Sequence, residues 1–129
     1  MPVDSRFTSR PFTVAACCVS CSPEVADVVM ARLRETVRNC PHAVLVVART
    51  LLGQVSDVFM GSGQGVLLAF QPCTAERAPA SPTHWIGPVC TEADAHSVCE
   101  WIADGRWTRD TLPSGLRLHA NLVRSSVLN

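Results

Sequence analysis

The pattern of apolar and polar positions predicts a strand–helix–strand unit in the first part of the chain. Residues 12–18 form a short apolar, β-branched run that is typical of a buried strand. Across residues 23–39, apolar side chains recur from Ala26 to Val37 at the spacing of one helix face, while arginine and glutamate occupy the other face. Residues 43–48 are apolar without alternation, which favours a strand covered on both faces. The helical connection makes these two strands parallel, with a right-handed crossover.

The rest of the pattern predicts a short helix, two antiparallel strands and a second long helix. Residues 54–60 have helical character and end at a run of Gly, Ser and Gln that breaks the helix. Residues 66–70 and 84–89 are predicted strands, and the proline-rich link between them favours an antiparallel hairpin with a long loop. Thr91 is the expected N-cap of the last helix, which should end at Gly105.

The order of these elements predicts an α/β fold of the thioredoxin-like class, with a mixed four-stranded sheet and helices on both faces. Residues 1–105 would form this domain. Residues 106–129 would form a C-terminal tail whose leucines, including Leu112 and Leu116, are too apolar to remain in water. We therefore expect the tail to pack on the body of the domain or on a partner subunit.

Composition places the chain among globular proteins and excludes several partners. Of the 129 residues, 47% are apolar and 17% are charged, and eleven basic residues balance eleven acidic ones. No net field therefore attracts nucleic acid. Residues 1–10 lack the apolar core of a secretory signal, and no stretch reaches the ~18 apolar residues of a membrane span, so we expect neither secretion nor membrane insertion. Seven cysteines without such a signal favour thiol, metal or redox chemistry in the reducing cytoplasm.

Three of the cysteines, Cys17, Cys18 and Cys21, fall where the first strand meets the first helix, and we call them the cysteine cluster. A sulfur there lies near the positive end of the helix dipole, which lowers the pKa of a thiol and favours the thiolate that binds metals or attacks disulfides. Buried cysteines also serve simply as core residues, but three within five positions favour a function.

Cys18 and Cys21 additionally form a Cys-x-x-Cys pair at the redox position of the thioredoxin plan. A dithiol–disulfide role is therefore one hypothesis for the cluster. The dithiol enzymes of that fold carry a proline directly before the third strand, whereas this chain has Gly65 there. That difference weakens the redox hypothesis.

The other candidate ligands are scattered along the predicted elements. Cys40 and Cys21 lie at opposite ends of a helix about 25 Å long, so they cannot share a mononuclear metal. Cys73 and Cys90 flank the predicted hairpin, and Cys99 lies on the buried stripe of the last helix. The four histidines show no zinc-finger spacing, and no hydrolase, metalloprotease, P-loop or dinucleotide fingerprint is present. The sequence therefore contains none of these enzyme fingerprints, and whether the chain is an enzyme stays open.

Three stretches of the chain resemble the thioredoxin-like [2Fe-2S] ferredoxins, in particular the small versions found in GC-rich bacteria. They are residues 13–18, residues 65–72, and residues 85–89 with the Thr91-capped helix that follows. The resemblance covers about the first 105 residues. It implies one [2Fe-2S] cluster held by four cysteines, two after the first strand and two in a Cys-x-x-x-Cys loop after the second. It also implies a homodimer.

The loop that should supply the second ligand pair departs from this family pattern. Residues 49–55 keep the glycine but contain no cysteine. Hydroxyl or aliphatic side chains do not replace thiolates on cluster iron. A complete ligand set would therefore need Cys73 or Cys90 brought to the cysteine cluster by folding or by dimerisation.

Three functional hypotheses follow from the sequence. The first is a ferredoxin-like electron-transfer protein that binds a [2Fe-2S] cluster or another metal through Cys17, Cys18 and Cys21, with Cys73 as a further cluster ligand. The second is a thiol-redox protein that uses Cys18 and Cys21. The third is a cluster-free relative that keeps the scaffold and works as an accessory or binding protein. The expected partners are a second copy of the chain and a redox partner protein.

Overall fold

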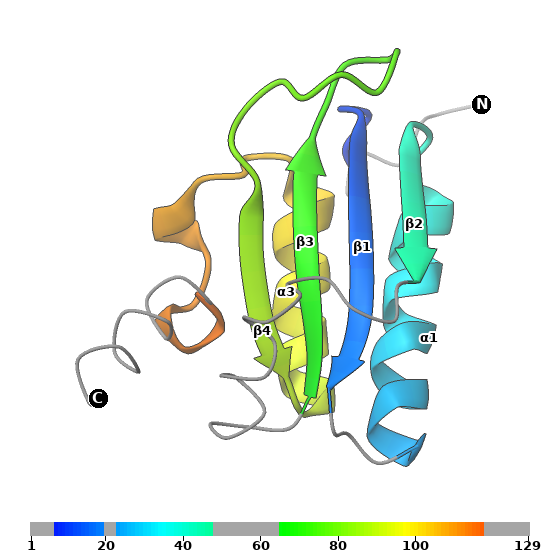
Figure 1. Cartoon of the computed structure of the whole chain (residues 1–129), viewed down its shortest axis with the longest axis vertical. Coiled ribbons are helices and arrows are strands. Elements are labelled where there is room, and N and C mark those ends of the chain that lie inside the picture. The colour runs from blue at the N-terminus through cyan, green and yellow to red at the C-terminus, as the bar shows by residue number, and fades with distance from the viewer. Residues whose placement is uncertain (1–6, 20–22, 48–64, 118–129) are drawn as a thin grey trace.

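A mixed four-stranded sheet forms the body of the protein (Figure 1). The structure, a computed structural model, describes residues 7–19, 23–47 and 65–117. The strands are β1 (Phe12–Val19), β2 (Ala43–Val47), β3 (Gly65–Pro72) and β4 (His84–Val89). They lie in the order β2-β1-β3-β4, with β2 parallel to β1, β3 antiparallel to β1 and β4 antiparallel to β3. This arrangement confirms the α/β, thioredoxin-like sheet predicted from the order of the elements.

Two long helices pack side by side on one face of this sheet (Figure 1). α1 (Pro23–Asn39) connects β1 to β2, and α3 (Glu92–Asp104) follows β4. Thr91 caps α3 by accepting a hydrogen bond from the Asp94 backbone N–H at 3.0 Å, and Gly105 ends the helix at a φ of 83°, which favours glycine. Both helices begin and end where the sequence predicts. No helix in the described part of the chain is long and apolar enough to cross a membrane.

The core lies between the sheet and these two helices. Phe12, Val14 and Ala16 alternate along β1, are at most 1% exposed, and belong to one hydrophobic cluster with Leu33 of α1. Their alternation is that of a strand with one face turned to the helices. The short helix expected at residues 54–60, which would cover the second face of the sheet, lies outside the described residues.

β2 lies at an edge of the sheet and pairs with β1 alone among the described strands. Val44, Val46 and Val47 are 38%, 45% and 65% exposed. The prediction of a strand covered on both faces is therefore wrong for this segment. An apolar run without alternation does not distinguish a central strand from an apolar edge strand, because both lack polar positions.

The β3–β4 hairpin contains one irregularity, at Gly87. The register of the two strands shifts between Val66 and Leu68 of β3, and Gly87 takes a φ of 132°. A Cβ at this position would lie 2.9 Å from the carbonyl oxygen of Val66, so only glycine fits. This bulge sets the path of the chain from β4 into α3.

The residues after α3 continue the core. Trp107 is 8% exposed, and its ring meets the rings of Phe12 and Phe70 edge-on, with centroid distances of 5.4 and 4.8 Å. Its indole N–H donates to the carbonyl oxygen of Ile102 at 2.9 Å. Trp107 therefore belongs to the same hydrophobic core as the central strand.

Two short 3-10 turns follow Trp107. They are η1 (Arg109–Thr111) and η2 (Ser114–Leu116), and Leu112 between them is buried. Arg117, which follows η2, forms an isolated β-bridge with Ile86 of β4. The expected C-terminal tail thus packs on the body of the domain as far as Arg117, and its remainder lies outside the described residues.

Replacing Trp107 with alanine tests whether the core extends past residue 105. The substitution removes a buried ring and its two aromatic contacts, so we expect it to lower the free energy of unfolding by about 3–5 kcal/mol. Urea denaturation followed by circular dichroism measures the change. Arg106→Ala, at an exposed neighbouring residue, should alter stability by less than about 0.5 kcal/mol. Equal stability of the two variants would contradict the place of Trp107 in the core.

Candidate functional site

Cys17 and Cys18 lie near the end of β1 on opposite faces of the sheet, because side chains alternate along a strand. Cys17 pairs with Leu67 of β3 and is 2% exposed. Cys18 pairs with Val66 and is exposed. Of these two members of the cysteine cluster, Cys18 is therefore the one accessible to a reaction partner.

The sulfur of Cys18 is oxidised, because Cys18 is disulfide-bonded. The thiols that take part in no disulfide are those of Cys17, Cys40, Cys73, Cys90 and Cys99. Cys21, the third member of the cysteine cluster, lies outside the described residues. An oxidised sulfur therefore occupies the position at which the sequence predicts reactive chemistry.

Cys73 lies at the opposite end of the sheet from Cys18. It follows Pro72, which pairs with Phe12 at the start of β1. Cys18 is six residues further along β1, which corresponds to about 20 Å. Cys73 is also buried, and Arg77 donates a hydrogen bond to its sulfur at 3.5 Å. Within one chain, the fold does not bring Cys73 to the cysteine cluster.

Cys90 lies at the same end of the sheet as Cys18, a placement that the sequence leaves open. It follows Val89, which pairs with Val66, and Val66 in turn pairs with Cys18. A Cβ added to Gly65, the first residue of β3, would come within 3.0 Å of the Cys90 sulfur. The absence of a side chain at Gly65 therefore makes room for this sulfur at the end of the sheet.

The surroundings of Cys90 keep its thiol protonated. Its backbone N–H donates to the Asp94 carboxylate at 3.3 Å, and its thiol donates to the carbonyl oxygen of Pro88 at 3.5 Å. Burial and, to a smaller extent, the negative charge of Asp94 raise the pKa of Cys90. Cys90 is thus a weak nucleophile at neutral pH.

Cys40 and Cys99 are core residues. Cys40 is 3% exposed at the end of α1, and Cys99 is 8% exposed on α3. Burial is the main cause that raises the pKa of each thiol. The prediction that Cys99 fills the buried stripe of its helix is confirmed, and buried thiols of this kind are chemically inert.

The described residues do not assemble a metal site. In this part of the chain, no group of three or more Cys, His, Asp or Glu side chains lies close enough to hold a metal ion. A [2Fe-2S] cluster needs four ligands gathered at one place, whereas Cys17 lies on the other face of the sheet from Cys18 and Cys73 lies at its far end. The described sulfur atoms therefore do not fit such a cluster.

No protein-family model, curated protein or solved structure matches this chain significantly. The resemblance to the thioredoxin-like [2Fe-2S] ferredoxins accordingly stays a prediction from the sequence. The α/β fold rests on the strand order itself. The cysteine geometry is therefore the basis for a functional proposal.

Alkylation of Cys90 as a function of pH tests the electrostatics of this site. We expect its pKa to lie above the ordinary value of a cysteine thiol, and Asp94→Asn to lower it, because the substitution removes a neighbouring negative charge. Mass spectrometry of the peptide that contains Cys90 gives the rate. Asp110→Asn, on the η1 turn, is the control and should leave that pKa unchanged. A rate that already reaches its plateau at neutral pH would contradict the described surroundings of this thiol.

Proposed function

We propose that the chain is a thiol–disulfide redox protein whose reactive pair is Cys18 and Cys21. The observation that carries this proposal is the disulfide at Cys18, an exposed residue near the end of β1. Cys21 is the partner that the chain offers, because the other five of its seven cysteines are thiols. The two residues are also spaced as Cys-x-x-Cys, the spacing of dithiol redox pairs.

The position of this pair before α1 suits exchange chemistry. α1 begins at Pro23, two residues after Cys21, and the amide groups of its first turn carry a partial positive charge. That charge stabilises a thiolate relative to a thiol, so it favours the departing sulfur when the disulfide opens. Glu24 in the same turn opposes the effect in part, since its carboxylate is negative.

The proposed reaction transfers two electrons between the chain and a redox partner protein. A thiolate of the reduced partner attacks one sulfur of the pair, forms a mixed disulfide and releases the other sulfur as a thiolate. A second thiol of the partner then attacks the mixed disulfide. The partner leaves with a disulfide, and Cys18 and Cys21 become thiols after protonation.

A reducing compartment would give the disulfide at Cys18 a redox meaning. Five cysteines are thiols, and Cys18 is disulfide-bonded. In the cytosol of most organisms, the disulfides that do occur are transient and catalytic or redox-sensing. In the cytoplasmic location that the sequence predicts, the disulfide at Cys18 would therefore be redox-active.

A [2Fe-2S] or other metal centre at Cys17, Cys18 and Cys21 is the competing proposal. The position of Cys90 favours it, since this sulfur lies at the same end of the sheet as Cys18 and adds a donor there. Three observations weigh against it. The disulfide uses a sulfur that the metal would need, Cys17 lies on the other face of the sheet, and Cys73 lies at its far end.

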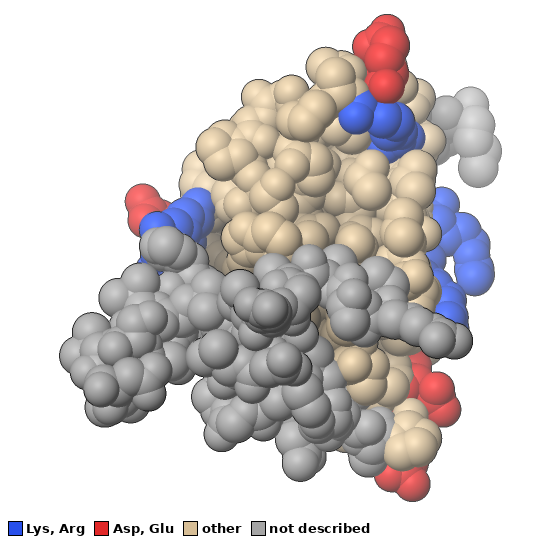
Figure 2. All heavy atoms as spheres, in the orientation of Figure 1, with Lys and Arg blue, Asp and Glu red and all other residues tan. Residues whose placement is uncertain are grey.

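We also propose that the chain forms a homodimer through the outer edge of β2. An edge strand presents backbone N–H and C=O groups to which a second strand can bind. Val44, Val46 and Val47 add exposed apolar surface to this strand. Figure 2 views the sheet face turned away from the two helices, and there the described residues are mostly ones other than Lys, Arg, Asp and Glu, with charged residues around the rim.

Thiol counting before and after mild reduction tests the redox proposal. Dithiothreitol should release two thiols from protein isolated in air, and alkylation with peptide mapping should assign them to Cys18 and Cys21, because these residues form the proposed disulfide. Cys18→Ser should abolish the release of this pair. Cys73→Ser, at the far end of the sheet, is the matched control and should leave it intact.

Metal analysis of anaerobically isolated protein separates this proposal from its alternatives. The redox proposal predicts a colourless protein without stoichiometric iron. Iron with inorganic sulfide and visible absorbance, lost in Cys18→Ser, would contradict it and favour the cluster. Thiols at both Cys18 and Cys21 after isolation in air, without iron, would contradict both proposals and favour the cluster-free accessory protein.

Sedimentation equilibrium tests the proposed dimer. The mass should be twice the 13.9 kDa of one chain, and Val46→Asp should shift it toward a single chain, because it places a charge on the β2 surface. Val28→Asp is the matched control, since Val28 is a similarly exposed valine, at 41%, on α1. A single-chain mass for the unaltered protein, or equal dissociation by the two substitutions, would contradict the β2 interface.

A further inference from the structure

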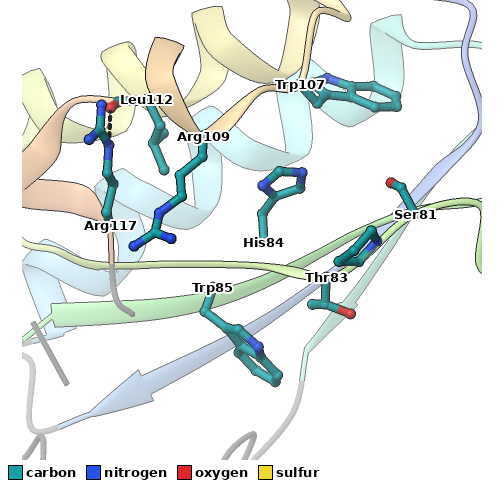
Figure 3. A pocket seen from close by; sticks show the side chains of 9 residues that line it. Ser81, Thr83, His84, Trp85, Trp107, Arg109, Leu112 and Arg117 are labelled. Carbon is teal, nitrogen blue, oxygen red and sulfur yellow. Dashed lines mark hydrogen bonds between the residues drawn. The ribbon is translucent and has the colours of Figure 1, made fainter. Parts of the chain in front are cut away.

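A pocket of about 440 Å³ lies beside the start of β4 (Figure 3). Its walls include His84, the first residue of β4, and Trp107, which follows α3. His84 pairs with Phe70 of β3, four residues along that strand from the partner of Cys18, which corresponds to about 13 Å. The pocket is therefore a separate site from the cysteine cluster, and no cysteine is among its described lining residues.

Two arginines line this pocket, and none of its described lining residues is acidic. Arg109 belongs to η1, and Arg117 follows η2. Arg10 is not among the described lining residues, but its guanidinium lies 4.4 Å from the ring centroid of Trp107, which is. The chain as a whole has no net charge, so the excess of positive charge among the lining residues is a local feature of the pocket. Such a concentration of cations around a hollow attracts anions.

The two arginines are held differently. Arg117 donates from Nε to the carbonyl oxygen of Leu112 at 2.8 Å and from Nη2 to that of Asp110 at 3.1 Å, so its guanidinium is fixed at the wall. The Arg109 side chain makes no hydrogen bond or ion pair with any described residue. Figure 3 shows it between Arg117 and His84. The Arg109 guanidinium therefore keeps donors that suit a carboxylate or phosphate group, in a pocket whose wall also carries the held Arg117.

The rest of the lining includes three aromatic residues, His84, Trp85 and Trp107, and adds no charge. The ring of His84 meets that of Trp101 edge-on at a centroid distance of 5.2 Å. Burial lowers the pKa of His84, so its imidazole is neutral at pH 7. Figure 3 shows Trp107 on the side of His84 away from the two arginines. A ligand that spans the pocket therefore meets cations at one end and aromatic surface at the other.

We propose that this pocket binds a small organic anion with a planar, apolar body. The carboxylate or phosphate group of the ligand pairs with Arg109 and Arg117, and the body lies against His84 and Trp107. A volume of about 440 Å³ falls in the range of small-molecule sites and accommodates a two-ring compound. The site does not depend on the redox proposal, since the two share no described residue.

Isothermal titration calorimetry with three probes of one shape tests this proposal. The probes are 2-naphthoate, 2-naphthyl phosphate and the neutral 2-naphthalenemethanol. At least one anion should bind with a Kd of about 1 mM or lower, and about ten-fold more tightly than the neutral compound. The tighter of the two anions identifies the preferred charged group. Equal affinity for the neutral compound, or no binding of either anion, overturns the proposal.

A matched pair of substitutions locates the binding. Arg109→Gln should weaken binding of the better anion about ten-fold, because it removes the cation whose donors are available. Arg34→Gln, the same change at an exposed position on α1, should leave the affinity unchanged. Thermal denaturation of both variants establishes that they fold, and backbone NMR shifts on titration should centre on Leu112 and Arg117. Unchanged affinity in Arg109→Gln, or shifts confined to other regions, overturns the proposal.

Discussion

The alternation of side chains along β1 is the constraint on which the rest of the structure depends. Phe12, Val14 and Ala16 must face the helices, because their burial holds the sheet to α1 and α3. A slip of one residue would turn all three to the other face. At the end of the strand burial no longer follows this alternation, because Cys18 shares the face of Ala16 and is exposed, whereas Cys17 lies on the opposite face and is buried. The register of β1 therefore sets the face on which each sulfur lies, and the local cover at the end of the strand decides which one is exposed.

The antiparallel path of β3 decides which other cysteines lie at the same end of the sheet as Cys18. Cys73, which follows β3, reaches the start of β1, whereas Cys90, which follows β4, returns to the end where Cys18 lies. Cys18 and Cys90 therefore lie at one end of the sheet and Cys73 at the other. The arginine-lined pocket at the start of β4 lies apart from that end. We thus propose two chemically different surfaces on one small fold, one for thiol–disulfide exchange and one for an organic anion.

The helices are predicted well because their signals are local. The spacing of apolar residues along one helix face and the cap residues Thr91 and Gly105 can each be recognised within a short stretch of sequence. The sequence did not separate Cys73 from Cys90, because strand register depends on pairing between distant segments. It also ended the domain at residue 105, since packing of Trp107 on the central strand is a tertiary contact without a local pattern. The sequence did not predict the two arginines of the pocket either, because isolated arginines form no sequence motif and only tertiary packing brings them to one pocket.

The equilibrium potential of the Cys18 disulfide tests the proposed redox function most directly. Protein equilibrated in glutathione or dithiothreitol buffers of defined potential, then alkylated and weighed by mass spectrometry, gives the reduced fraction at each potential. A redox-active pair should titrate as a two-electron couple with a midpoint between about −270 and −120 mV. A midpoint below about −300 mV would identify a structural disulfide that resists glutathione, and it would contradict a redox role for Cys18.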